Sequence, residues 1–218
     1  MTPSRNPTRW VGLSAADRRA ERRELLLDAA FELLGTEGWS GTTVRAVCQA
    51  ARLNARYFYE GFHDLDALLV AVYDRVVAQL GAEVMTAVAE ADDDPRSQIH
   101  AALDRIVSFV DEDRRRGRVL YVAALGNEAL NRRRIETAHL LVGVVEEGGA
   151  APHGRPAEGE RIGRIAAAML VGGVGELVVA WLEGRIDVSK EQLVDDASAL
   201  MVAVGDAAAS IAAARRRV

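Results

Sequence analysis

The stretch of sequence that decides the fold is TTVRAVCQAARLNARYFYEGFHDLDALL, residues 42–69. Within residues 44–48 the apolar side chains recur at the i, i+3 and i+4 spacing of one helix face. A tight turn follows, and a second short helix places Phe58 and Phe62 four residues apart on one face, where they form a small core. A third helix starts directly afterwards. This pattern predicts a helix-turn-helix, which makes double-stranded DNA the first candidate partner.

Polar residues mark the two helix starts and the surface left outside the core. Thr43 and Asn54 each precede a helix, where a side-chain oxygen accepts a hydrogen bond from an otherwise unpaired backbone N–H. Arg56 projects outward from the second helix and is the candidate base reader, because its planar fork can bond guanine through two hydrogen bonds. The other outward residues can reach phosphates or base edges. The predicted DNA-binding residues are Thr43, Arg45, Asn54, Arg56, Tyr57 and Tyr59.

Residues 24–71 resemble the DNA-binding domain of the TetR family of bacterial transcriptional regulators. The resemblance covers roughly the first third of the chain. The run LLLDAAFELLGTEGWSGTTV is similar to the first helix of that family and the turn into its second. The run LNARYFYEGFHDLDALL is similar to its recognition helix and the start of its fourth. The resemblance implies DNA contacts at Arg45, Arg56, Tyr57 and Tyr59, and a helix capped against a phosphate by Thr43.

The chain departs from the family pattern after the recognition helix. Leu65 stands where the family usually has a lysine that binds a phosphate, and Glu60 and Gly61 replace a pair that is commonly polar or aromatic. Losing the lysine removes one charge-assisted contact per subunit, so phosphate binding must come from elsewhere.

The N-terminal segment is the first alternative source of positive charge. Arg5 and Arg9 lie in a proline-containing stretch, residues 1–13, that either enters a minor groove as a flexible basic arm or forms a solvated tail. The arginines of residues 18–23 alternate with acidic residues, which favours a solvated helix face. Residues 1–60 hold nine Arg and seven Asp or Glu, although the whole chain has a net charge of −5. A weakly basic head on an acidic body is typical of local, directed DNA contact.

Composition and helix-breaking residues predict an all-α protein of about nine helices. We expect a flexible arm (1–13), a three-helix helix-turn-helix domain (14–63) and a helical ligand-binding and dimerisation domain (64–218). The last two helices, about 158–183 and 189–215, are rich in small residues that allow close packing. The resemblance implies that these two helices form a four-helix homodimer interface, although packing inside one monomer is the alternative.

Export and membrane insertion are not expected. Cys48, the single cysteine, lies on an apolar helix face and is interpreted as a buried hydrophobe. We recognise no signal peptide, and we expect no apolar run to approach the eighteen or so residues of a membrane span. The predicted location is the cytoplasm.

A small-molecule effector is implied by the resemblance alone, as is its binding between the helices of the second domain. Each candidate can equally be an ordinary core residue. The pocket candidates are Tyr73, Phe109, Tyr121, Asn127, His139, Met169 and Trp181.

An enzyme is the rival class. Glu136 and His139, and likewise Glu60 and His63, have the Glu-x-x-His spacing with which ferritin-like bundles hold two iron ions. The second pair crosses a helix junction at Gly61, and one pair alone does not make such a site. No nucleophile elbow or phosphate loop is present. We therefore expect no catalysis, metal or cofactor.

The sequence thus predicts a dimeric repressor that a small-molecule effector releases from a palindromic operator. Two alternatives stay open: a DNA-binding regulator without a ligand, whose second domain serves dimerisation or a protein partner, and a helical-bundle metalloenzyme.

Overall fold

The computed structural model describes residues 14–148 and 157–215, and every regular element in those two ranges is helical, as predicted. The helices are α1 (Ala15–Thr36), α2 (Gly38–Gly41), α3 (Val44–Ala50), α4 (Ala55–Gly61), α5 (Leu65–Glu90), α6 (Pro95–Glu112), α7 (Arg114–Gly117), α8 (Glu128–Gly148), α9 (Ala157–Leu182) and α10 (Lys190–Arg215). A π-helix, η2 (Arg118–Val122), and a 3₁₀-helix, η3 (Ala123–Gly126), connect α7 to α8. The described ranges hold ten α-helical segments instead of about nine, because the short α2 was not predicted. The predicted arm, residues 1–13, lies outside them.

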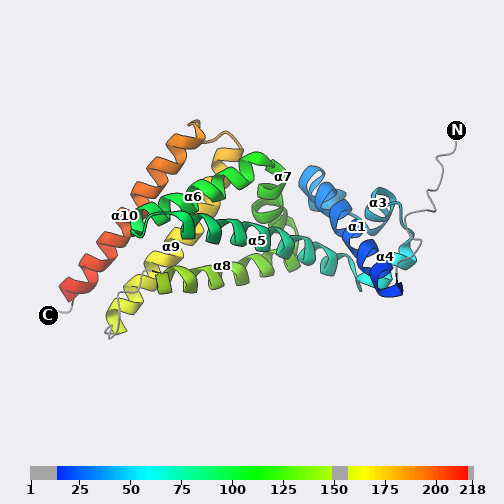
Figure 1. Ribbon diagram of the computed structural model, residues 1–218, viewed down its shortest axis with the longest axis horizontal. Helices are drawn as coiled ribbons and strands as arrows, with labels where there is room; N and C mark the ends of the chain where they lie inside the picture. The colour runs from blue at the N-terminus through cyan, green and yellow to red at the C-terminus, as the bar shows by residue number, and fades with distance from the viewer. Residues whose placement is uncertain (1–13, 149–156, 216–218) are drawn as a thin grey trace.

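The molecule is elongated, with a small helical head at one end (Figure 1). Helices α1, α3 and α4 form the head, and α6, α9 and α10 lie at the opposite end, with α5 running from one to the other. We call the part from α5 to α10 the body. Helix α5 packs against α1 in the head and against α6 and α8 in the body. Helix α5 therefore connects the head to the body through packing contacts with both.

Local capping explains why the helices begin where they do. The Asp64 side chain accepts from the backbone N–H of Ala67 (2.8 Å) at the start of α5. Pro95 occupies the first turn of α6, where its missing N–H costs no hydrogen bond. Before α10, the Ser189 hydroxyl accepts from the Gln192 N–H (3.2 Å) and the Gln192 side chain accepts from the Ser189 N–H (3.1 Å). This reciprocal capping box fixes the start of α10.

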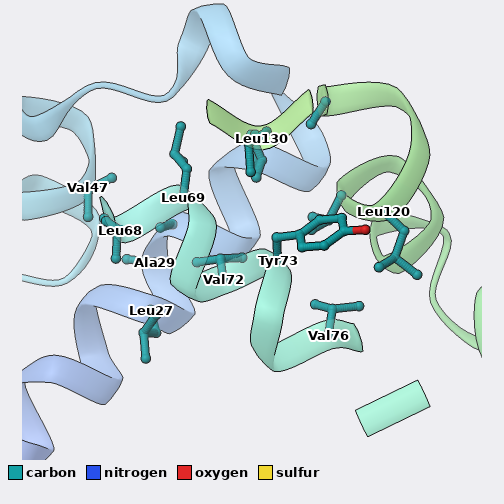
Figure 2. Close-up of a cluster of buried hydrophobic side chains, with 14 of the residues drawn as sticks. Leu27, Ala29, Val47, Leu68, Leu69, Val72, Tyr73, Val76, Leu120 and Leu130 are labelled. Carbon is teal, nitrogen blue, oxygen red and sulfur yellow. The ribbon is translucent and has the colours of Figure 1, made fainter. Parts of the chain in front are cut away.

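One buried apolar cluster runs through the head and into the body (Figure 2). Leu68, Leu69 and Val72 on α5 lie among side chains of the head, including Val47. Further along α5, Tyr73 and Val76 lie near Leu120 of η2. A buried cluster that spans both parts makes it costly to separate the head from the body. The predicted domain boundary at residues 63 and 64 therefore falls within a continuous core.

The helical path is irregular between α6 and α8. Gly117 lies at the close approach of α7 and α9, where an added Cβ would lie 2.6 Å from Leu182 Cδ1 and 2.7 Å from Val110 Cγ1. The chain then passes through η2 and η3, and η2 contacts α1, α5 and α9. Short π-helical segments are uncommon and are found often at functional positions. This segment brings the body against the C-terminal end of α1.

Helices α9 and α10 keep much apolar surface uncovered. Within the described residues, Arg161–Leu182 and Lys190–Arg215 are long and apolar enough to cross a membrane by length and composition. The expectation that no apolar run approaches this length was therefore wrong. Few of these residues are buried in the chain, and Ile165, Met169, Leu200 and Ile211 are exposed. A second molecule or another apolar environment is needed to cover this surface.

Candidate nucleic-acid interface

Helix α4 presents the surface that the sequence predicted. Phe58 is buried on its inner face, and Phe62 is buried just after its end. Arg56 and Tyr59 point outward, with 84% of the Arg56 side chain and 60% of Tyr59 exposed. Arg45 is exposed on the neighbouring helix α3. The fold thus places a short, partly aromatic and partly basic helix surface in the solvent, of a size that fits a major groove.

Thr43 and Asn54 act as the predicted helix caps. The Thr43 hydroxyl accepts from the Ala46 N–H (3.1 Å), and the Asn54 side-chain oxygen accepts from the Tyr57 N–H (3.2 Å). Both residues are exposed. Capping uses only the oxygen atoms of these side chains as acceptors, so the Thr43 hydroxyl proton and the Asn54 amide NH₂ remain available to donate, and capping and phosphate binding are compatible.

Tyr57 and Tyr59 differ in their surroundings. Tyr57 is half-buried, and the Arg22 guanidinium lies 4.5 Å from the centre of its ring. The Tyr59 ring meets Phe58 edge-on, with centroids 5.2 Å apart. Packing against Phe58 restricts the Tyr59 ring, while most of the residue stays exposed. Tyr59 is therefore the better placed of the two tyrosines to reach a DNA backbone or base edge.

Arg22 and Arg23 of α1 pack on α4, which corrects the interpretation of residues 18–23 as a solvated face for these two arginines, while Arg19 is exposed. Arg22 pairs with Glu60 (3.2 Å) and covers Tyr57. Arg23 donates to the Gly61 carbonyl (3.0 Å), and its guanidinium lies 4.1 Å from the Phe62 ring centre. These partners are 38 residues away in sequence. No local spacing signal could have identified them.

Glu60 holds two arginines at once. One carboxylate oxygen lies 3.3 Å from Arg56 Nε, and the other lies 3.2 Å from Arg22 Nη2. From the sequence, Glu60 stands out as a departure from a family pattern and as one member of a Glu-x-x-His pair. In the structure it is the charged centre of the surface that α4 presents.

The structure also accounts for Leu65 at the position of the usual lysine. Leu65 is half-buried and packs against the core of the head, at the first residue of α5. Its neighbour His63 lies 3.0 Å from the Asp64 carboxylate. The start of α5 therefore has an apolar contact at Leu65 and a capping carboxylate at Asp64, in place of the lysine of the family pattern.

The structure does not gather the seven pocket candidates around one hollow. Phe109 and Tyr73 are buried core residues, and Tyr121 and Trp181 are half-buried. Asn127 is buried and donates to Asp66 (2.8 Å), while its side-chain oxygen caps α8 by accepting from the Leu130 N–H (2.9 Å). His139 and Met169 are exposed. Their role as a ligand site stays a prediction.

Two open hollows occur elsewhere on the described surface. One, of about 590 Å³, lies between α6, α10 and the end of α5 and includes His100 and Arg96. The other, of about 510 Å³, lies between the head and the body and includes Trp39, Arg118 and Leu182. Of the seven pocket candidates, none lines either hollow.

The Glu-x-x-His pairs are engaged in other contacts. Glu136 pairs with Arg133 (3.1 Å), and Glu60 pairs with two arginines as described above. Among the described residues, no three His, Cys, Asp or Glu side chains are grouped so that they could hold a metal ion.

Comparison with known proteins agrees with this geometry. Residues 26–72 match the family described as bacterial regulatory proteins, tetR family. The chain is 34% identical over 83 residues to the HTH-type transcriptional regulator BetI of Stenotrophomonas maltophilia, covering 38% of this chain and 42% of the relative. A BetI of Burkholderia thailandensis is 34% identical over 85 residues, or 39% of this chain and 44% of the relative. The match thus spans less than half of these relatives.

Solved structures extend the similarity in fold along most of the chain. A transcriptional regulator from Pseudomonas aeruginosa superposes with a TM-score of 0.66 at 21% identity, covering 91% of this chain and 95% of that one. The fatty acid degradation regulator FadR from Bacillus halodurans superposes with a TM-score of 0.65 at 16% identity, covering 83% and 94%. Since identity is low, these structures bear on the fold alone. Residues 26–72 are thus similar to the tetR family of bacterial regulatory proteins, and the remaining helices share their fold with solved transcriptional regulators.

Proposed function

We propose that the protein is a sequence-specific DNA-binding transcriptional regulator that acts in the cytoplasm as a homodimer. The observation that carries this proposal is the outward surface of α4, where Arg56 and Tyr59 are exposed on a helix capped by Asn54. The helix is held rigidly from behind by Phe58, which is fully buried. A rigid, exposed helix with an arginine and an aromatic residue suits readout of base edges in a major groove.

Dimerisation is supported by the uncovered apolar surface of the last two helices. Met169 on α9 and Leu200 on α10 are 65% and 67% exposed, although both are large apolar residues. Pairing two copies through α9 and α10 removes such surface from water. A two-fold pair can then read two half-sites about one DNA turn apart, roughly 34 Å, which makes the operator a palindrome.

The finer proposal is a repressor that a small-molecule effector releases from this operator. Its support is the path of α5, which carries core residues of the head and the body on one continuous helix. A ligand that binds better to one tilt of α5 shifts the population of recognition-helix spacings.

The alternative is a regulator without an effector, which the dispersed placement of the seven pocket candidates favours. Thermal unfolding with a panel of metabolites distinguishes them, because a ligand of the folded state raises apparent stability.

Selection of binding sites tests the main proposal. The purified chain is mixed with fragmented genomic DNA of its source at near-physiological salt, and the retained fragments are sequenced. We expect a short palindrome to be recovered. Retention of random fragments that dissociate together as salt rises, or of no fragments, would overturn sequence-specific binding.

A further inference from the structure

Glu60 is the feature of the head that the proposed function has not yet used. Its side chain is 29% exposed and lies between Arg56, which is almost fully exposed, and Arg22, whose side chain is only 16% exposed. The Arg22 guanidinium is itself fixed against the Tyr57 ring. An isolated surface ion pair on a helix contributes little to stability. The Arg56–Glu60 pair is not isolated, because the Glu60 carboxylate also pairs with the largely buried Arg22.

The contact with Arg56 is made at the Nε atom. Glu60 Oε1 lies 3.3 Å from Arg56 Nε, across one turn of the same helix. A guanidinium that is held at Nε keeps its two terminal nitrogens free, and these can donate to the O6 and N7 acceptors of guanine. Holding the side chain in advance also reduces the rotamer freedom that Arg56 loses on binding. Glu60 therefore orients the base-reading group before DNA arrives.

The charge of Glu60 has a second effect on DNA binding. A carboxylate on the face of α4 repels the phosphates of any duplex, whatever its sequence. Where Arg56 finds its base partner, the gain from a well-oriented contact offsets this repulsion. Where it does not, the repulsion remains. The two effects together lower affinity for arbitrary DNA more than affinity for the preferred site.

We propose that Glu60 is a positioning residue that sets the sequence discrimination of the protein, by holding Arg56 through Nε and by opposing binding to DNA without the matching guanine. This inference rests on the proposed DNA-binding function. It concerns a residue that acts through Arg56 and does not require Glu60 to touch DNA.

The test compares full-length variants on two duplexes of equal length: the palindrome recovered by selection and a scrambled version of it. Dissociation constants are measured across a salt series. For Glu60→Gln we expect the ratio of scrambled to palindrome dissociation constants to fall about tenfold, within the range of one bidentate base contact. Glu60→Asp keeps the charge but shortens the side chain, so it should also lose discrimination without gaining affinity for scrambled DNA.

Glu24→Gln is the matched control, because it removes one negative charge from an ion pair of α1 with Arg75 that does not involve Arg56. It should change binding to both duplexes alike. A merely structural role of Glu60 is separated by combining Glu60→Gln with Arg56→Ala. Once Arg56 is absent, Glu60→Gln should cost no further discrimination, whereas a general disturbance of α4 would cost it in both backgrounds.

The outcomes are distinguishable. If the wild-type chain selects no sequence, the proposed function fails and this inference fails with it. If the wild type discriminates and Glu60→Gln retains the full ratio, the proposed function stands and the positioning role of Glu60 is overturned.

Discussion

Arg118 Nη1 donates a hydrogen bond to the carbonyl oxygen of Gly35 (3.2 Å), joining the body to the last full turn of α1. The Arg115 side chain packs on the same glycine and pairs with Glu32, also on α1. Because the last carbonyls of a helix lack partners within the helix, a cation there is doubly favourable. The end of α1 is thus attached to the segment between α6 and α8, and the orientation of the head depends on that attachment.

Gly35→Ala should destabilise the protein. An added Cβ would lie 2.5 Å from Arg115 Cβ and 3.1 Å from Arg115 Cα, so a change of rotamer cannot relieve the clash. We expect the free energy of unfolding to fall by about 1–3 kcal/mol in a denaturant titration. Gly81→Ala is the matched control, since nothing lies within 4 Å of the added Cβ on α5, and it should stabilise by up to about 1 kcal/mol. Equal effects of the two substitutions would contradict the close approach.

Arg52→Gly should stabilise the turn of the helix-turn-helix. Arg52 has φ 54° and follows the end of α3, a position where glycine is preferred because it has no Cβ to clash. Relief of about 1–2 kcal/mol of backbone strain exceeds the entropic cost of glycine, about 0.5–1 kcal/mol. We expect a gain of up to about 1 kcal/mol in chemical denaturation. Gln49→Gly, within α3, should instead destabilise by about 1 kcal/mol. A loss in both variants would mean that the Arg52 side chain itself contributes to stability.

Features that depend on neighbouring residues could be predicted from the sequence. Thr43, Asn54 and Ser189 cap helices because their partners lie three residues away, and the buried positions of Phe58 and Phe62 follow from helix periodicity. These interactions form as soon as the helix forms. Sequence reasoning therefore identified the helices other than α2, and the outward face of α4.

Features that depend on how helices dock could not be predicted. Arg22 meets Glu60 across 38 residues, and Arg118 meets Gly35 across 83. The same alternation of acidic and basic residues fits a solvated helix face, so composition alone does not separate the two cases. The exposed positions of His139 and Met169 likewise depend on helix orientation within the body, which residue type alone does not specify.

Stability should fall above about pH 10 in a way that depends on Tyr121. Burial, with a smaller contribution from nearby Tyr73, raises the pKa of Tyr121 to about 12 from 10. The unfolded chain therefore releases this proton at lower pH than the folded protein does. The stabilising contribution is fully present below about pH 10 and is lost as pH rises toward about 12. Burial also raises the pKa of Tyr73, which adds a slope of the same sign.

The measurement for Tyr121 is the free energy of unfolding at a series of alkaline pH values. Tyr121→Phe should flatten the decline between about pH 10 and 12. An identical decline in the variant and the wild type would show that the folded protein does not raise the pKa of Tyr121.

Charge placed on the last two helices should separate the proposed dimer. Met169→Glu and Leu200→Glu introduce carboxylates at exposed apolar positions of α9 and α10, where pairing would bury them without a partner. We expect each variant to elute as a folded monomer, with its mass measured by light scattering and its helicity by circular dichroism. Met85→Glu, on the exposed surface of α5, is the control and should remain dimeric. Unchanged mass in both test variants would exclude α9 and α10 as the interface and direct attention to other apolar surfaces, such as that of α8.

Arg56→Ala should weaken binding to the selected palindrome by about 1–3 kcal/mol and relax the preference for the base pair that Arg56 contacts. The reason is geometric, because the terminal nitrogens of Arg56 extend from α4 into solvent while its Nε is held by Glu60. Arg132→Ala provides a matched control. Arg132 is exposed and forms the same type of i, i+4 pair, with Glu128, but on α8 in the body. Fluorescence anisotropy with single-base variants of the palindrome gives the change at each position. A uniform loss across all duplexes, scrambled ones included, would assign Arg56 to phosphate binding instead of base reading.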